Sequence, residues 1–183
     1  MSDVFIYTSP IDPRAKPLID ELIYEYDSRY GTYFNAEGAA AELNRYPPEA
    51  FAPPHGNFLL LIRDGETIGG GAFKHYDERT AEFKRIWTRR DLRRQGLARK
   101  VLVELEEQAA RQGYSRIYLT TGFRQPEAVG LYFNYGYTAL FDISVDPEVY
   151  KSLPFEKDIS HLAQARLENE AVEPLLRVAG GNL

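Results

Sequence analysis

The chain of 183 residues fits a single domain and is long enough to bury a hydrophobic core. It contains no cysteine, which excludes disulfides, thiolate metal sites and a cysteine nucleophile. A formal net charge of -5 disfavours non-specific nucleic-acid binding and would suit a cationic substrate. No apolar run reaches the length of a membrane span, and polar residues interrupt the start where a signal peptide would be apolar. We therefore expect a cytoplasmic protein with no membrane partner.

The first third of the chain predicts one strand and two helices. A β-prone run covers residues 4–7. Apolar residues then recur at helical spacing, which predicts a helix over 17–30 with Gly31 at its C-terminal end. A weaker helical pattern covers 36–44. Residues 47–56 contain four prolines, and we expect them to form an irregular connection that serves as a mobile wall of a site.

The middle of the chain predicts three antiparallel strands that are linked by hairpins. They cover residues 57–63, 67–74 and 80–88, and turn-forming residues separate each from the next. Three consecutive glycines, at positions 69–71, interrupt the second of these strands. Glycines inside a strand indicate a β-bulge or a close approach by another part of the backbone.

The last part of the chain alternates helices and strands. A helix over 97–112 has an apolar face and ends before Gly113; the face consists of Leu97, Val101, Leu102, Leu105 and Ala109. The further predicted elements are a strand over 116–121, a helix over 126–134, strands over 137–141 and 153–159, a helix over 160–171 and a disordered tail over 179–183. This order predicts an α+β fold with a mostly antiparallel sheet and one βαβ unit over 80–121.

The stretch with the most unusual composition is residues 88–100, where six of thirteen residues are basic in an acidic chain. It joins a predicted strand to the start of a predicted helix, where free N–H groups and the helix dipole favour an anion. Three interpretations stay open from these residues alone: a solvated helix start, a nucleic-acid patch, and a site for a phosphate-bearing cofactor. The basic residues are confined to one loop and one turn, which weakens the nucleic-acid interpretation.

Two motifs, one of them in this stretch, resemble those of a known enzyme family. Residues 93–98 fit Q/R-x-x-G-x-G/A, the acetyl-CoA motif of the GNAT N-acetyltransferases. Residues 128–137 resemble the A-x-x-L-Y-x-x-x-G-F/Y segment of the same family. Each motif follows a predicted strand, and the pair together is specific. The chain is similar to small bacterial-type GNAT members over residues 1–159. Residues 160–183 lie outside the resemblance and are expected to form a C-terminal helical extension and flexible tail.

The resemblance implies a GNAT fold and a site for acetyl-CoA. The sheet is expected to splay open between its fourth and fifth strands, here residues 80–88 and 116–121, with acetyl-CoA in the opening. Three residues are expected to pair their backbone with the pantetheine arm: Ile86, Trp87 and Thr88. The loop that follows is expected to bind the diphosphate through N–H groups and arginine side chains: Arg93, Arg94, Gln95, Gly96, Leu97, Ala98 and Arg99. Gln125 stands where many relatives have an asparagine that contacts the pantetheine.

Acetyl transfer to an amine requires a base for the amine proton and benefits from an acid for the leaving thiolate. Tyr132 occupies the motif position of the family's usual acid; the alternative is a tyrosine that packs on the cosubstrate. Glu82 lies fourteen residues before Gly96, the spacing of the catalytic glutamate in histone-type relatives. The alternatives for Glu82 are deprotonation through water and a surface ion pair with Lys84 or Arg79.

These features predict an N-acetyltransferase that moves acetyl from acetyl-CoA to a primary amine of a small molecule or peptide by direct attack. A GNAT-like sensor that binds acyl-CoA without turnover is the alternative, and the retained Tyr132 favours the enzyme. The three histidines lack metal-like spacing, so no metal is expected. No nucleic-acid partner is expected, and a homodimer is left open. The acceptor pocket is expected from residues 17–56 and the 141–153 loop, where no motif names the acceptor.

Overall fold

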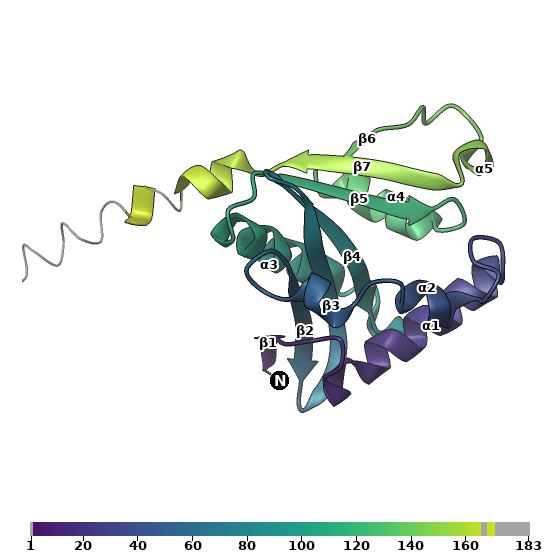
Figure 1. The fold of residues 1–183 in the computed structure, drawn as a ribbon, viewed down its shortest axis with the longest axis horizontal. Helices are drawn as coiled ribbons and strands as arrows, with labels where there is room; N and C mark the ends of the chain where they lie inside the picture. Colours follow the sequence, from purple (N-terminus) through teal and green to yellow (C-terminus); the bar gives the residue numbers. More distant parts are fainter. Residues whose placement is uncertain (1, 166–167, 171–183) are drawn as a thin grey trace, which may run out of the picture.

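The computed structural model describes residues 2–165 and 168–170. Within them, seven strands form one sheet in the order β1-β2-β3-β4-β5-β7-β6, with helices packed on its faces (Figure 1). The strands are β1 Asp3–Tyr7, β2 Asn57–Arg63, β3 Glu66–Asp77, β4 Thr80–Thr88, β5 Arg116–Gly122, β6 Thr138–Ala139 and β7 Ser152–Asp158. The helices are α1 Lys16–Tyr30, α2 Ala39–Leu43, α3 Leu97–Arg111, α4 Pro126–Asn134 and α5 Pro147–Tyr150, with short 3-10 helices at Pro13–Ala15, Pro48–Phe51 and Arg90–Leu92. The predicted α+β fold with a mostly antiparallel sheet is confirmed.

The sheet opens between β4 and β5, as expected from the resemblance. These two strands are parallel and pair only at their first residues, Thr80 to Glu82 with Arg116 to Tyr118. Beyond Glu82 they diverge, and Figure 1 shows β5 and β7 leaning away from the half of the sheet that contains β1 to β4. The crossover from β4 to β5 runs through α3, which confirms the predicted βαβ unit.

Two hydrophobic cores cover opposite faces of the β1–β4 half of the sheet. Alternate residues of β2 belong to different cores, because successive side chains of a strand point to opposite faces. Leu59 and Leu61 pack in the core that contains α3, whereas Phe58 and Leu60 pack in the core beneath α1. The predicted apolar face of α3 is buried in the first core along its whole length: Leu97, Val101, Leu102, Leu105 and Ala109.

A β-bulge in β4 lies opposite the glycines of β3. Ala72 pairs with Lys84, but Gly70 pairs with Trp87, so β4 holds one residue more than β3 across this interval. Arg85 occupies the extra position with a φ of 63°, which is uncommon for a residue other than glycine. The bulge shifts the alternation of side chains along β4, so that residues on either side of it reach the same face.

The glycines of β3 are also sites of close packing. A Cβ atom on Gly70 would lie 2.6 Å from the carbonyl oxygen of Leu59, and one on Gly71 would lie 2.7 Å from side-chain atoms of Ile86 and Leu105. Both features that the glycine run predicted, a bulge and a close approach, are therefore confirmed.

Two predicted elements differ from the structure, and one short helix was not predicted. The second helix is only Ala39–Leu43, because Gly38 has a φ of 86° and starts the helix three residues later than expected. The strand expected over 137–141 is reduced to Thr138–Ala139, since the N–H of Tyr137 donates to the carbonyl of Tyr132 at the end of α4. Helix α5 was not predicted, although Asp146 caps it through the N–H of Glu148. Residues 160–165 and 168–170 are helical; the end of the helix predicted to 171 and the tail over 179–183 lie outside the described residues.

Candidate active site

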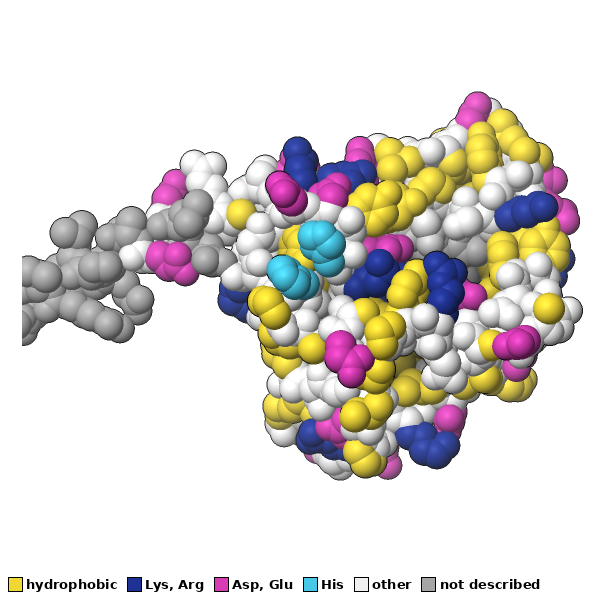
Figure 2. Space-filling view, in the orientation of Figure 1, with side chains coloured by type: hydrophobic (Ala, Val, Ile, Leu, Met, Phe, Trp, Pro, Cys, Tyr) yellow, Lys and Arg dark blue, Asp and Glu magenta, His cyan; other side chains and the backbone are white. Residues whose placement is uncertain are grey.

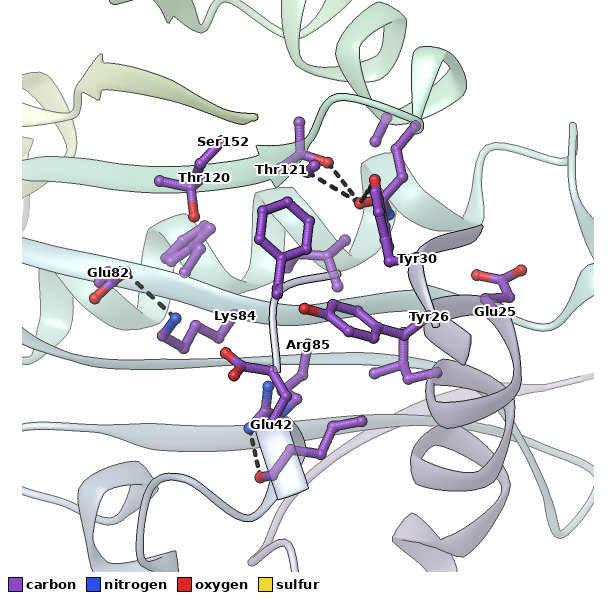
Figure 3. Close-up of a pocket in the computed structure, with 18 of the residues that line it drawn as sticks. Glu25, Tyr26, Tyr30, Glu42, Glu82, Lys84, Arg85, Thr120, Thr121 and Ser152 are labelled. Atoms are coloured by element: carbon purple, nitrogen blue, oxygen red, sulfur yellow. Dashed lines mark hydrogen bonds and ion pairs between the residues drawn. The ribbon is translucent and has the colours of Figure 1, made fainter. Parts of the chain in front are cut away.

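A cleft of about 630 Å³ fills the opening between β4 and β5. Side chains from α1, β4, β5 and α4 line it, together with residues 42–43 and 45–46 at the end of α2 and just after it. Figure 3 shows them pointing into the space between the two strands. Four of the predicted site residues line this cleft: Glu82, Ile86, Gln125 and Tyr132. The structure therefore brings together side chains that are up to fifty residues apart in the sequence.

The edge of β4 that faces the cleft has free backbone groups. On one side β4 pairs with β3 on either side of the bulge, at Phe83, Lys84, Trp87 and Thr88. On the other side the described part of the chain pairs with β4 only at Thr80 to Glu82. The Trp87 side chain turns into the core beneath α1, where its Nε1 is buried and has no hydrogen-bond partner among the described residues. Thr88 pairs with Gly69. Along this edge the backbone N–H and C=O groups are available at Ile86, Trp87 and Thr88. Such an edge suits an extended ligand that pairs with β4 like an added strand.

The loop from Arg93 to Arg99 leads from β4 to α3 and ends in an open helix start. Gly96 is the N-cap of α3 with a φ of 75°, and no side chain among the described residues caps the helix. Arg94 also has a positive φ, of 66°. A Cβ atom on Gly96 would meet nothing within 4 Å, so the backbone here is open to a ligand. Uncapped N–H groups in the first turn of a helix favour an anion.

The basic side chains of this loop have different partners. Arg93 forms an ion pair with Glu25 of α1. The guanidinium of Arg99 lies 5.8 Å from the ring centroid of Tyr135. Arg94 is exposed, as are the neighbouring side chain of Gln95 and the backbone of Gly96. None of residues 93–99 lines the cleft itself, so the loop lies beyond its end. Only Nη2 of Arg93 bonds to Glu25, so the predicted contact with a phosphate would use the other N–H groups of this guanidinium.

Gln125 lines the cleft but its side-chain oxygen is already engaged. Oε1 accepts hydrogen bonds from the N–H of Gly122 (3.0 Å), the Thr121 hydroxyl (3.2 Å) and the Tyr30 hydroxyl (3.2 Å). These bonds hold the turn between β5 and α4 and connect it to the end of α1. The predicted contact of Gln125 with pantetheine would have to come from its amide nitrogen.

Tyr132 is buried on α4 with its ring against Tyr137 and Phe155, at centroid separations of 5.5 Å for both. Only 6% of the residue is exposed, yet it lines the cleft. Burial raises the pKa of the Tyr132 phenol well above its usual value. Within the described residues the hydroxyl has no hydrogen-bond partner. A protonated, unengaged hydroxyl in this position is able to donate to a ligand in the cleft.

Glu82 lies on the wall of the cleft near the point where β4 and β5 separate. It is 9% exposed, so it is not the surface residue that one alternative supposed. Its carboxylate forms ion pairs with Lys74 (3.3 Å) and Lys84 (3.4 Å) rather than with Arg79. Figure 3 shows the pair with Lys84. A buried carboxylate between two ammonium groups could accept a proton, or it could serve only as part of a structural ion pair. The role of Glu82 as base therefore stays a prediction.

Comparisons with known proteins match this arrangement to one family. The model of the Acetyltransferase (GNAT) family matches residues 19–137. The chain belongs to the GNAT acetyltransferase family. Relatives of this GNAT acetyltransferase include the IAA acetyltransferase of Azospirillum brasilense, 30% identical over 128 residues that make up 68% of this chain and 81% of that protein. The uncharacterized N-acetyltransferase YjgM of Escherichia coli is 26% identical over 125 residues, or 66% of this chain and 75% of that protein.

Solved structures share the fold of this GNAT acetyltransferase. The putative acyl-CoA N-acyltransferase from Klebsiella pneumoniae has a TM-score of 0.64 and 24% identity, covering 86% of this chain and 97% of that one. The PaiA N-acetyltransferase of Thermoplasma acidophilum, solved in complex with coenzyme A, has a TM-score of 0.64 and 18% identity, covering 86% and 99%. Acetyl-CoA is the cosubstrate of this GNAT acetyltransferase, which is an N-acetyltransferase. The free edge of β4 and the open backbone at Gly96 fit that cosubstrate.

Two groups of residues that line or border the cleft were not predicted from the sequence. One is aromatic and packs the end of α1 against the turn after β5, with ring centroids 5.0 to 6.2 Å apart: Tyr26, Tyr30, Tyr33, Phe34 and Phe123. The other is basic and includes Lys74 and Arg85. Periodicity predicted the longer strands and helices one by one, but no spacing in the sequence relates residues of β3 to those before β2. These groupings were therefore not predictable from the sequence.

Three acidic residues of α1 bond to other groups of the protein. Glu21 accepts a hydrogen bond from the N–H of Arg90, Glu25 pairs with Arg93, and Asp27 accepts one from the N–H of Ala39. They do not supply the attraction for a cationic substrate that the overall charge suggested. Among the described residues no group of His, Cys, Asp and Glu could hold a metal ion, and no helix has the length and hydropathy to cross a membrane.

Proposed function

We propose that this protein transfers the acetyl group of acetyl-CoA directly to a primary amine of a small molecule or peptide, with Tyr132 as the acid and Glu82 as the base. The observation that carries the proposal is the free edge of β4 on one side of the cleft together with the buried Tyr132 hydroxyl in its wall. An extended thioester along that edge would place its sulfur within the cleft that Tyr132 lines.

The bonds made and broken follow from the groups present. The amine nitrogen attacks the acetyl carbonyl carbon, and the carbon–sulfur bond breaks. The amine loses one proton, either to the Glu82 carboxylate or to a water that Glu82 orients. The departing sulfur receives one proton from the Tyr132 hydroxyl, which burial keeps in its neutral form. No covalent enzyme intermediate is needed, and the chain has no cysteine to form a thioester.

Two further features support the binding of acetyl-CoA. The uncapped start of α3 offers N–H groups to a diphosphate, and the glycine at position 96 keeps a side chain from standing between them. Exposed Arg94 adds positive charge at the same place. Residues 93–99 lie beyond the end of the cleft, which suits a ligand whose reactive end is distant from its phosphates.

Release of free thiol from acetyl-CoA tests the proposal. The assay uses a panel of primary amines, amino acids and short peptides, with a blank that lacks any acceptor. We expect thiol release that depends on at least one acceptor and yields the N-acetylated product by mass spectrometry. If acetyl-CoA binds but no acceptor accelerates thiol release, the sensor alternative would replace this proposal.

Two predictions from the sequence concern the cell and the assembly. A cytoplasmic location is tested by fractionation of the source cells, and a homodimer by light scattering on the purified chain. Neither affects the chemistry proposed for the cleft.

A further inference from the structure

A group of cations lies at the end of the cleft away from the start of α3. It is called the basic cluster below and consists of Arg45, Lys74, Lys84 and Arg85. Three of its members surround the ring of Tyr46, with distances to the ring centroid of 4.8 Å for Arg45, 4.9 Å for Lys74 and 5.0 Å for Lys84. Figure 2 shows Lys and Arg side chains gathered in the hollow of this face, and Figure 3 shows Lys84 and Arg85 side by side on β4.

The carboxylates of the protein do not neutralise this cluster. Lys74 and Lys84 share one partner, Glu82, at 3.3 and 3.4 Å. Arg45 pairs with Glu42 at 3.2 Å. Four cations thus face two carboxylates, which leaves an excess of positive charge at this end of the cleft although the chain as a whole is acidic.

Arg85 is the cation without a carboxylate. Its one hydrogen bond among the described residues runs from Nη2 to the carbonyl oxygen of Leu43, at 2.7 Å. Burial lowers the pKa of the Arg85 guanidinium, and the charge of Glu42 only partly opposes this effect. The side chain lines the cleft, and none of its nitrogens is both fully buried and without a partner. The remaining N–H groups of a desolvated guanidinium are therefore accessible from the cleft.

The bulge in β4 fixes where this guanidinium lies. Because Arg85 takes the extra position, at a φ of 63°, it shares a face with Glu82 and Lys84. It directly precedes Ile86, where pairing with the pantetheine arm is predicted to begin. Its partners are Leu43, the last residue of α2, and Phe51, the last residue of the 3-10 helix Pro48–Phe51; neither belongs to the loop before α3. Arg85 therefore lines the cleft without contacting the loop that is expected to bind the phosphates, which leaves it available to an acceptor.

We propose that the acceptor is a small amine that also carries a carboxylate, such as a free amino acid, and that Arg85 binds this carboxylate. A guanidinium with free N–H groups matches a carboxylate in a two-bond contact, and binding would compensate for the burial of its charge. Arg85 would then determine specificity, because a site that holds a buried charge rejects analogues that leave the charge unpaired. The proposal rests on the acetyl transfer proposed above and names its substrate class.

The test compares acceptors that differ only in the carboxylate. Thiol release from acetyl-CoA is measured with glycine, β-alanine, L-glutamate and L-phenylalanine, and with the amide of each in which the carboxylate nearest the amine is a carboxamide. For at least one pair, we expect kcat/KM for the acid to exceed that for its amide by about 10- to 100-fold, as for a hydrogen-bonded charge. Amides that react as well as all four acids would overturn the proposal.

Variants of Arg85 locate the effect. Arg85→Gln should reduce kcat/KM for the acid to the level of its amide, with KM for acetyl-CoA unchanged, and Arg85→Lys should restore part of the difference. Arg45→Gln is the matched control, since Arg45 belongs to the same cluster but is exposed and already paired with Glu42. It should keep the preference for the acid. An Arg85→Gln variant that lowers acid and amide rates equally would contradict the role of Arg85.

A binding experiment separates failure of this inference from failure of the proposed acetyl transfer. Protein saturated with coenzyme A is titrated calorimetrically with the same acids and amides. Acids that bind to the wild type but not to Arg85→Gln support the carboxylate site even if no thiol is released in the first assay. If none of the acids binds better than its amide, the carboxylate site is wrong whatever the turnover.

Discussion

Replacement of Tyr132 by phenylalanine removes one oxygen atom from the wall of the cleft and leaves the ring in place. The ring contacts with Tyr137 and Phe155 are available to phenylalanine as well. The hydroxyl has no partner among the described residues, so its removal leaves no protein group unpaired. We therefore expect Tyr132→Phe to leave the free energy of unfolding unchanged or to raise it by up to about 1 kcal/mol, because a buried hydroxyl without a partner does not stabilise the fold.

The effect of the same change on turnover is expected to be much larger. A positioned general acid contributes about 10²- to 10⁴-fold to a rate. Burial raises the pKa of Tyr132 and makes it a weaker acid, which favours the lower end of this range. We expect Tyr132→Phe to lower kcat about 100-fold, equivalent to about 2.7 kcal/mol of activation free energy.

The measurement is the initial rate of thiol release, with calorimetry for the affinity of acetyl-CoA and thermal unfolding for stability. Tyr135→Phe is the matched control, because Tyr135 lies just after α4 and does not line the cleft. Full turnover of Tyr132→Phe would refute the assignment of the acid. A loss of turnover matched by an equal loss of acetyl-CoA affinity would leave Tyr132 with the packing role alone.

Three further predictions concern the base, the sheet and alkaline pH. Glu82→Gln should lower kcat about 100-fold at neutral pH. The rate of the variant should also rise with pH over a range in which the rate of the wild type does not change. An unchanged pH–rate profile would exclude Glu82 as the base. Gly70→Ala should destabilise the fold by about 1–3 kcal/mol in urea unfolding, because the new methyl group meets the carbonyl oxygen of Leu59. The control is Gly130→Ala, in open space on α4, which should be neutral or stabilising. Equal effects of the two substitutions would contradict the packing argument. The raised pKa of Tyr132 contributes stability that is present below the unfolded value of about 10 and is lost as pH rises toward the folded value. Thermal unfolding between pH 9 and 11 should show a smaller loss for Tyr132→Phe than for the wild type, and identical losses would count against burial as the cause.

The sequence was sufficient for the parts of the fold that depend on periodicity and on turn residues. Strand β4, helix α3 and strand β5 were each predicted within one residue of their observed ends, and the run at positions 69–71 indicated the bulge. The elements that failed are short ones that tertiary contacts define. Strand β6 is cut short because the Tyr137 N–H bonds back to α4, and no local pattern contains that bond.

For the site, too, the sequence predicted what depends on motifs but not what depends on tertiary contacts. Motif spacing predicted that Tyr132 and Glu82 belong to one cleft, which they both line. The positive charge of the basic cluster was not predictable. It results from the bulge at Arg85 and from the approach of Leu43 and Tyr46 to the cations of β3 and β4. The acidic composition pointed to a cationic substrate, whereas the acids of α1 bind the protein's own N–H and guanidinium groups. Overall charge does not report the charge of a particular cleft.

The central claim is that acetyl-CoA lies along β4 with its diphosphate on the N–H groups that begin α3. The most direct test is calorimetric titration of acetyl-CoA into the wild type, Gly96→Glu and Gly113→Glu. Both glycines have positive φ values, of 75° and 101°, and open space where a side chain would start, and they lie at opposite ends of α3. Substitution is strained at both positions, and more so at Gly113, whose φ lies further from the left-handed helical region. Backbone strain alone would therefore not explain a loss of binding confined to Gly96→Glu. We predict binding at one site per chain for the wild type and Gly113→Glu, and no detectable binding for Gly96→Glu; wild-type affinity in Gly96→Glu would contradict the account.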